Sequence, residues 1–252
     1  MLENINFKKI VKCFLPYGII ALWRRIKSTH ILPQRPFNSF NWNLANLKQR
    51  GINIKTIIDI GASNGSWTKS IMDVFPESDY FLIEANMYHK NELEKFTKDN
   101  NNVKYILAAA GDKVGEIYFD NSDPFGGLAL YEKPEGPFTT VPLVTVDQCI
   151  YENELKGPFL LKLDTHGFEV PIFNGSEKML KETNIIIVEA YNFKIAKDSL
   201  LFYEMCGYLS KYGFRCNGII DVSYRPKDNF LWQMDLVFIK DTREEFKYNN
   251  FK

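Results

Sequence analysis

The sequence has few cysteines, no excess of either charge and no long uninterrupted apolar run. Its four cysteines, Cys13, Cys149, Cys206 and Cys216, form no CxxC pair, which argues against a zinc site and a disulfide framework. They are typical of reduced thiols, so we expect a cytoplasmic protein. Lysine and arginine number 31, as do aspartate and glutamate. Without a basic excess, nucleic acid is not an expected partner.

The chain of 252 residues fits one large domain with short appendages. Residues 1–37 form an N-terminal segment with an apolar run between basic pairs, too short to span a bilayer. We expect residues 8–27 to lie peripherally on the inner face of a membrane or on a partner protein. The alternative is a helix packed on the protein's own core. Residues 38–240 form the main domain, and residues 241–252 are a charged tail.

Strands and helices alternate along the main domain. Apolar runs predict strands at residues 56–60, 79–84, 103–110, 159–164, 185–190, 214–220 and 234–240. Helical patterns lie at residues 38–51, 66–75, 87–99 and 198–212, and a further one runs towards Leu180 after the turn that follows residue 164. This order predicts an α/β fold with a doubly wound parallel sheet. Residues 115–148, rich in glycine and proline, are predicted to be an insertion over the carboxyl edge of the sheet, where substrates bind.

The stretch TIIDIGASNGSWTKSI, residues 56–71, indicates a ligand-binding turn. A β-branched strand leads into a turn bracketed by Gly61 and Gly65, and a helix follows, with Ser66 as its predicted N-cap. No lysine completes an ATP-binding P-loop, and Ser63 stands where a dinucleotide loop has its second glycine. The pattern favours S-adenosylmethionine, which has no phosphate and whose ammonium group Asp59 could meet.

Two further acidic residues follow strands that lie next in the chain. Glu84 ends the second predicted strand, where a carboxylate can accept hydrogen bonds from both ribose hydroxyls of an adenosine cofactor. Asp112 follows the third predicted strand, and we expect it near the amino group of the adenine. Both predictions are compatible with S-adenosylmethionine as the cofactor.

The motifs together resemble those of the FkbM-type methyltransferases. IIDIGASNGSWT, YFLIEAN, AAAGDKVGEIYF, LLKLDTHGFEVPIFNGSEKML and IIIVE occur in the family's order and spacing. The resemblance spans roughly residues 40–240. It implies a class I S-adenosylmethionine-dependent O-methyltransferase with a Rossmann-like, mostly parallel seven-stranded sheet whose last strand is antiparallel. The implied cofactor-binding residues are Asp59, Gly61, Ala62, Ser63, Asn64, Gly65, Glu84, Ala85 and Asp112.

Transfer of a methyl group to a hydroxyl needs alignment and a base that takes the hydroxyl proton. The segment KLDTHGFE offers Asp164, His166 and Glu169 after the fourth strand. We predict His166 as the base, because a free imidazole titrates near neutrality. The family more often has an acidic residue in place of His166, which indicates either a subgroup with its own substrate or a site that needs no fixed base there. Separately, the resemblance implies Asp164 as the functional carboxylate. Glu189 is a third catalytic candidate, and the predicted acceptor-binding residues are Glu169, Tyr191 and Phe125.

The predicted acceptor is a sugar hydroxyl in a bacterial surface glycan or a glycosylated metabolite. This rests on the resemblance and on the insertion, whose Phe119, Phe125 and Tyr131 could stack on pyranose rings. Asp164, His166 and Glu189 could converge on Mg²⁺, but no ligand spacing demands an ion, and we predict none.

Two alternative functions stay open at the level of the sequence. The first is an NAD-dependent sugar oxidoreductase or epimerase, against which stand Ser63 and the lack of a YxxxK pair near a suitable strand. The second is a non-catalytic cofactor-binding protein. It is disfavoured because Asp59, the glycine turn and Glu84 are all present.

Overall fold

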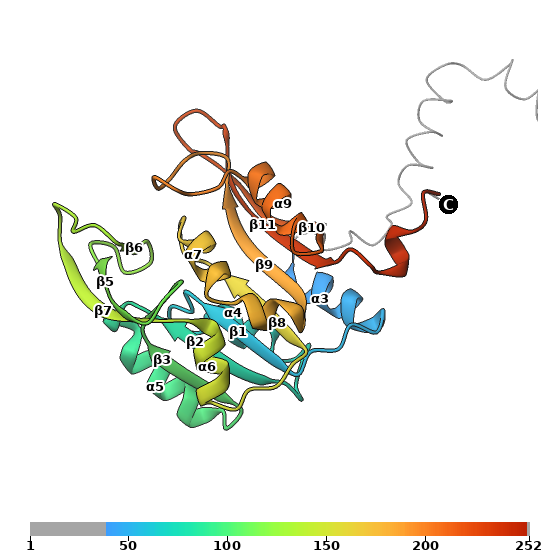
Figure 1. The fold of residues 1–252 in the computed structure, drawn as a ribbon, viewed down its shortest axis with the longest axis horizontal. Coiled ribbons are helices and arrows are strands. Elements are labelled where there is room, and N and C mark those ends of the chain that lie inside the picture. Colours follow the sequence, from blue (N-terminus) through green and yellow to red (C-terminus); the bar gives the residue numbers. More distant parts are fainter. Residues whose placement is uncertain (1–38, 251–252) are drawn as a thin grey trace, which may run out of the picture. The chain divides into compact units, whose positions relative to one another are not determined.

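The computed structural model describes residues 39–250 (Figure 1). The predicted membrane- or partner-binding segment therefore lies outside the described residues. Within residues 39–250, no helix combines the length and the apolar character that crossing a bilayer would require.

Seven strands form the main sheet, in the order β10-β11-β9-β8-β1-β2-β3. Neighbouring strands pair in parallel, except that β11 is antiparallel to both β9 and β10. The predicted α/β fold with an antiparallel last strand is confirmed. The bounds are β1 (Thr56–Ile60), β2 (Asp79–Glu84), β3 (Val103–Leu107), β8 (Phe159–Leu163), β9 (Thr183–Tyr191), β10 (Phe214–Tyr224) and β11 (Leu231–Lys240).

Helices cover both faces of this sheet, which explains why its central strands are apolar along their whole length. Ile57 packs in one core cluster and its neighbour Ile58 in the other. The cluster of Ile57 includes side chains of α3 (Phe40–Gln49), α4 (Ser66–Ile71) and α5 (Lys90–Asp99). The cluster of Ile58 includes those of α6 (Val146–Glu152), α7 (Glu169–Asn174), α8 (Glu177–Lys181) and α9 (Phe202–Ser210).

A second, four-stranded sheet is built mainly from the insertion, in the order β4-β7-β5-β6. Its strands are β4 (Ala109–Ala110), β5 (Gly115–Asp120), β6 (Leu128–Leu130) and β7 (Phe138–Val144). The strand predicted at residues 103–110 is therefore two strands. The backbone N–H of Ala108 donates a hydrogen bond to the carbonyl oxygen of Glu84 in β2. Three residues later, the N–H of Gly111 donates to Val144 of β7, so the chain has changed its partner strand.

The helix boundaries also differ from the sequence prediction. Gly65, in the left-handed region at φ 79°, is the N-cap of α4 in place of Ser66. That helix ends at Ile71. The helix predicted to run to residue 180 is broken into α7 and α8 at Gly175, where a Cβ atom would lie 1.9 Å from the carbonyl oxygen of Gly111.

The remaining elements are short. A 3₁₀ turn, η1 (Met87–His89), precedes α5, and η2 (Glu244–Phe246) lies in the charged tail. The guanidinium of Arg243 donates to the carbonyl oxygen of Arg50, so the described part of the tail contacts the C-cap of α3.

Candidate active site

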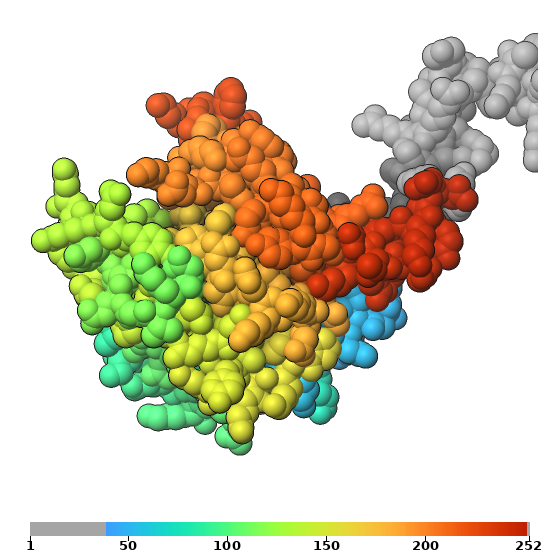
Figure 2. Space-filling model, viewed as in Figure 1, coloured from blue at the N-terminus to red at the C-terminus, as the bar shows by residue number. Residues whose placement is uncertain are grey.

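A cavity of about 440 Å³ lies at the carboxyl ends of the central strands of the main sheet. The turn after β1 and the ends of β2, β8 and β9 form one side of it, and residues of the second sheet form the other. Figure 2 shows the insertion in green beside the yellow and orange segments that follow β8 and β9. The volume lies in the range of small-molecule binding sites.

Glu84 lies at one end of this cavity and is held by the backbone. Its Oε2 accepts a hydrogen bond from the N–H of Ser63, and its Oε1 accepts one from the N–H of Asn86, both at 2.6 Å. Burial raises the pKa of this carboxyl, and the two backbone donors oppose the shift. Each oxygen keeps a further lone pair, so the carboxylate can also accept bonds from a bound diol.

The turn after β1 leaves room for a ligand because it has glycine where a side chain would clash. Gly61, Ser63 and Asn64 line the cavity. A Cβ atom on Gly61 would lie 2.0 Å from the carbonyl oxygen of Asp164, so only glycine fits between the ends of β1 and β8. Ser63 itself has a φ of 51°. A tight turn without a phosphate-binding lysine, next to a buried carboxylate, fits the adenosine and amino-acid parts of S-adenosylmethionine.

Asp59 does not reach the cavity surface. It is 0% exposed, its Oδ2 accepts a hydrogen bond from Thr68, and its Oδ1 lies 3.4 Å from the ammonium of Lys162. Lys162 is 3% exposed and also donates to Oδ2 of Asp164 at 3.0 Å. Burial lowers the pKa of Lys162, but the two carboxylates outweigh it and the pKa lies above its usual value. The lysine thus fills the place predicted for a ligand's ammonium group.

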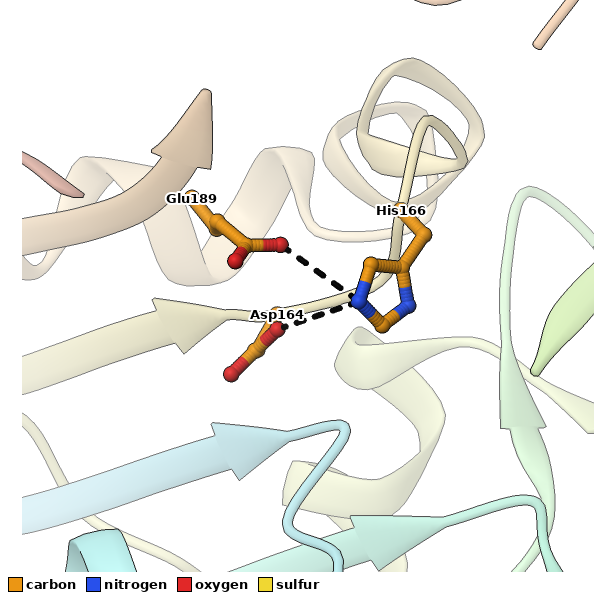
Figure 3. Close-up of side chains that lie close together, drawn as sticks. All are labelled: Asp164, His166 and Glu189. Carbon is orange, nitrogen blue, oxygen red and sulfur yellow. Dashed lines mark ion pairs between the residues drawn. The ribbon is translucent and has the colours of Figure 1, made fainter. Parts of the chain in front are cut away.

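Asp164, His166 and Glu189 converge at the other end of the cavity (Figure 3). Nε2 of His166 lies 3.9 Å from Oδ1 of Asp164 and 3.5 Å from Oε2 of Glu189. Asp164 and His166 follow β8, and Glu189 comes from the end of β9. His166 has a φ of 52°, in the left-handed region. Backbone strain of this kind concentrates at functional sites.

The two carboxyls of this cluster differ in their protonation. Burial would raise the pKa of Asp164, but the ammonium of Lys162 outweighs it, and the pKa lies below its usual range. Burial, followed by the charge of Asp164, raises the pKa of Glu189 to about 7. Glu189 also accepts hydrogen bonds from the hydroxyl of Tyr191 and from Nε2 of Gln233, each at 2.5 Å. The cluster therefore combines one firmly ionised carboxylate, Asp164, with a second carboxyl, Glu189, that is able to exchange a proton near neutral pH.

One potential ligand atom from each of these three residues lies within 4.8 Å of those of the other two. This is the convergence that a divalent cation would also need. The ammonium of Lys162, 3.0 Å from Oδ2 of Asp164, supplies a positive charge to the cluster without an ion. The expectation that no metal takes part stays a prediction.

Other predicted residues are distributed between the cavity and its surroundings. Ala85 and Phe125 line the cavity. Asp112 is exposed and accepts a hydrogen bond from the hydroxyl of Tyr131 at 2.6 Å. Glu169 is buried at the start of α7, where it accepts from the N–H of Gly167. The residues predicted for the site that are not among those lining the cavity are Asp59, Ala62, Gly65, Asp112, Glu169 and Tyr191.

Sequence reasoning missed four residues at this site. Lys162 stands two positions before Asp164 in the KLD motif, and a lone lysine in an apolar strand could have signalled a buried ion pair. Gln233 reaches the cavity from β11, far away in the sequence. Asn86 and His89 follow Glu84 around the start of the predicted helix at residues 87–99, where nothing in the sequence signalled a contact with the insertion.

A comparison with curated proteins found a relative by sequence. The chain is 26% identical over 183 residues to O-methyltransferase 2 of Dictyostelium discoideum; the match covers 62% of this chain. It spans about half, 51%, of the length of that relative.

Two solved structures are also similar in part. Magnesium protoporphyrin IX methyltransferase from Synechocystis PCC 6803 is 10% identical, with a TM-score of 0.44 over 95% of this chain and 100% of that chain. The fibrillarin pre-rRNA processing protein of Methanococcus jannaschii is 16% identical, with a TM-score of 0.46 over 75% and 67%.

The model of the methyltransferase FkbM domain matches residues 59–216, which is more than half of the chain. The match includes the glycine turn, Glu84 and the Asp164–His166–Glu189 cluster. The chain therefore belongs to the FkbM methyltransferases, and its cofactor is S-adenosylmethionine.

Proposed function

We propose that the protein is an O-methyltransferase that methylates a hydroxyl of a sugar, in a bacterial surface glycan or a glycosylated metabolite. One observation carries the proposal. The cavity has a carboxylate suited to a diol, Glu84, at one end and the titratable cluster of Asp164, His166 and Glu189 at the other. Family membership leaves the alternative of an NAD-dependent enzyme without support.

Bound S-adenosylmethionine supplies an activated methyl group on a sulfonium centre. The residues of the chain have to align the acceptor hydroxyl and take its proton, while an O–CH₃ bond forms and the S–CH₃ bond breaks. We assign proton uptake to His166. The carboxylates of Asp164 and Glu189, at 3.9 and 3.5 Å from its Nε2, stabilise the imidazolium that results.

The sugar acceptor is supported by an aromatic side chain of the insertion and by the polar residues at the end of β9. Phe119 lines the cavity, and an aromatic face packs well against the C–H surface of a pyranose. Gln233, which also lines the cavity, adds an amide for a neighbouring hydroxyl. The second alternative is a protein that binds the cofactor without catalysis. The activity assay described next distinguishes it from an enzyme.

The experiment incubates the protein with S-adenosylmethionine and a panel of p-nitrophenyl glycosides, and measures S-adenosylhomocysteine and the mass of the product. We expect a mass gain of one methyl group on a hydroxyl. His166→Gln should lower turnover by roughly 10² to 10⁴, the usual value of general-base help. It should leave the affinity for S-adenosylhomocysteine unchanged.

Two results would contradict the proposal. Transfer to an amine acceptor, with none to the glycosides, would reject O-methylation of a sugar. Normal turnover in His166→Gln would reject His166 as the base and leave Glu189, with its pKa of about 7, as the leading group. Loss of turnover after EDTA treatment, restored by Mg²⁺, would instead indicate that the cluster binds an ion.

A further inference from the structure

A second histidine, His89, joins separate parts of the cavity wall. It lies in η1, directly after β2, and is 1% exposed. Its Nε2 lies 2.9 Å from the carbonyl oxygen of Pro124 and 3.2 Å from Oγ of Ser63. Pro124 belongs to the loop between β5 and β6, residues 121–127, which we call the insertion loop. One buried imidazole therefore connects this loop to the glycine turn.

Further contacts tie the insertion loop to the same end of the cavity. The side-chain amide of Asn86 donates to the carbonyl oxygen of Pro124 at 3.3 Å, while its backbone N–H donates to Glu84. The ring of Phe125 lies 5.1 Å from the ring of His89 between centroids. The loop is thus anchored to the residues around Glu84, two strands away from Asp164 in the sheet order.

The side chains at this end leave space for a flat ring. Ala85 and the run Ala108–Ala110 line the cavity, and Phe125 lines it from the insertion loop. Phe125 is 64% exposed, so most of its ring surface is available to a bound molecule. An aromatic ring opposite small side chains is suited to stacking on a heteroaromatic ring.

We propose that His89 is a positioning residue that holds the insertion loop as the outer wall of the cofactor site, with Phe125 covering the adenosine part of S-adenosylmethionine. Phe125 then contacts the cofactor and not the acceptor, in contrast to the role predicted for it from the sequence. The proposal concerns cofactor binding alone, so it stands or falls independently of the sugar acceptor.

The imidazole acts through a hydrogen bond to a backbone carbonyl. With its proton on Nε2, His89 donates to Pro124, and Oγ of Ser63 can share that donor. On its other side, Nδ1 lies 3.4 Å from Oε2 of Glu92. Removing the ring leaves the longer hydrogen bond from the Asn86 amide to Pro124, so the loop is held more loosely, while the contacts of Glu84 are unchanged.

The test measures S-adenosylhomocysteine binding by calorimetry and chymotrypsin cleavage after Phe125 in the ligand-free protein. We expect His89→Ala to raise the dissociation constant about tenfold, the loss of one to two hydrogen bonds, and to speed that cleavage. His89→Gln, which can place an amide donor near Pro124, should recover most of both. Met87→Ala, an exposed position of the same 3₁₀ turn, should match the wild type.

Phe125→Ala tests the wall itself and changes an exposed side chain, so it remains informative if His89→Ala fails to fold. We expect it to raise the dissociation constant for S-adenosylhomocysteine several-fold. An unchanged constant in folded Phe125→Ala would overturn the role of Phe125. Wild-type binding and wild-type cleavage in folded His89→Ala would overturn the role of His89.

Discussion

The two ends of the cavity are held in different ways. At the Glu84 end, backbone N–H groups of Ser63 and Asn86 bind the carboxylate at 2.6 Å. At the other end, His166 faces Asp164 and Glu189 through side chains alone, at 3.5 to 3.9 Å. The first end is fixed by the turns that follow β1 and β2. The second depends on a balance of charges among side chains from two strands.

Under the proposed function, we expect cofactor binding to depend on the first end and the chemical step on the second. A carboxylate fixed by main-chain donors keeps its position whatever its neighbours do, which suits recognition of an invariant cofactor. A cluster of titratable side chains can change its protonation during a reaction. Substitutions should therefore affect the two ends differently, and three predictions test this.

The largest effect is expected from Lys162, the buried cation next to the Asp164–His166–Glu189 cluster. Lys162→Met leaves Asp59 and Asp164 without their shared counter-charge, and breaking a buried pair in this way costs about 3 to 5 kcal/mol. Urea unfolding measures the loss. Lys197→Met is the control, because that lysine is 83% exposed and 3.9 Å from Glu132. Equal stability of the two variants would show that Lys162 is not needed to hold the cluster.

The next effect distinguishes Glu84 from Asp112, the two acidic residues that the sequence assigned to adenosine. Glu84→Ala should weaken S-adenosylhomocysteine binding by about ten- to a hundredfold, since charge-assisted hydrogen bonds are lost. Asp112→Ala should change it less than about twofold, because its carboxylate is exposed and bonded to Tyr131. Calorimetry gives both constants. A larger rise of the dissociation constant in Asp112→Ala would support the position beside the adenine that the sequence predicted for Asp112.

The smallest effect is a pH dependence of stability from Glu189. Its folded pKa of about 7 lies above the unfolded value, so the folded state binds the extra proton. Stability from this group is present below pH 4.5 and is lost as pH rises toward 7. Asp235, whose pKa burial raises to about 7, acts in the same window. The free energy of unfolding of Glu189→Gln should therefore rise relative to that of the wild type by about 1 to 2 kcal/mol as the pH goes from 5 to 8.

Unfolding curves measured at several pH values would reveal the difference. A gap between wild type and Glu189→Gln that stays constant from pH 5 to 8 would mean that Glu189 titrates normally. Tyr191→Phe is a useful companion, because it removes one hydrogen bond to Glu189 and leaves the charge in place.

The sequence predicted most of the main sheet, because buried parallel strands are apolar along their whole length and are separated by helices. It also predicted that Gly61, Ser63, Asn64 and Glu84 share one site, since turns after neighbouring parallel strands meet at one edge of the sheet. The boundary between β3 and β4 was missed. A run of three alanines carries no signal that a strand leaves one sheet and joins another.

The charge arrangement was beyond sequence reasoning for a physical reason. Asp59 was expected to meet a ligand, but Lys162 lies opposite it in the register of β1 and β8. That register depends on the pairing of strands about a hundred residues apart. The same holds for Gln233, which reaches Glu189 from β11, and for His89, whose partner Pro124 belongs to the insertion.

The second sheet also bears on how this enzyme can be altered. Its pairings, β4 with β7, β7 with β5 and β5 with β6, are complete among themselves. Exchanging residues 115–144 for the matching segment of a relative would therefore leave the hydrogen bonds of the main sheet intact. In directed evolution, this segment is therefore suited to exchange as one unit. Each exchanged segment has to place a backbone carbonyl where that of Pro124 lies, because His89 of the recipient chain hydrogen-bonds there.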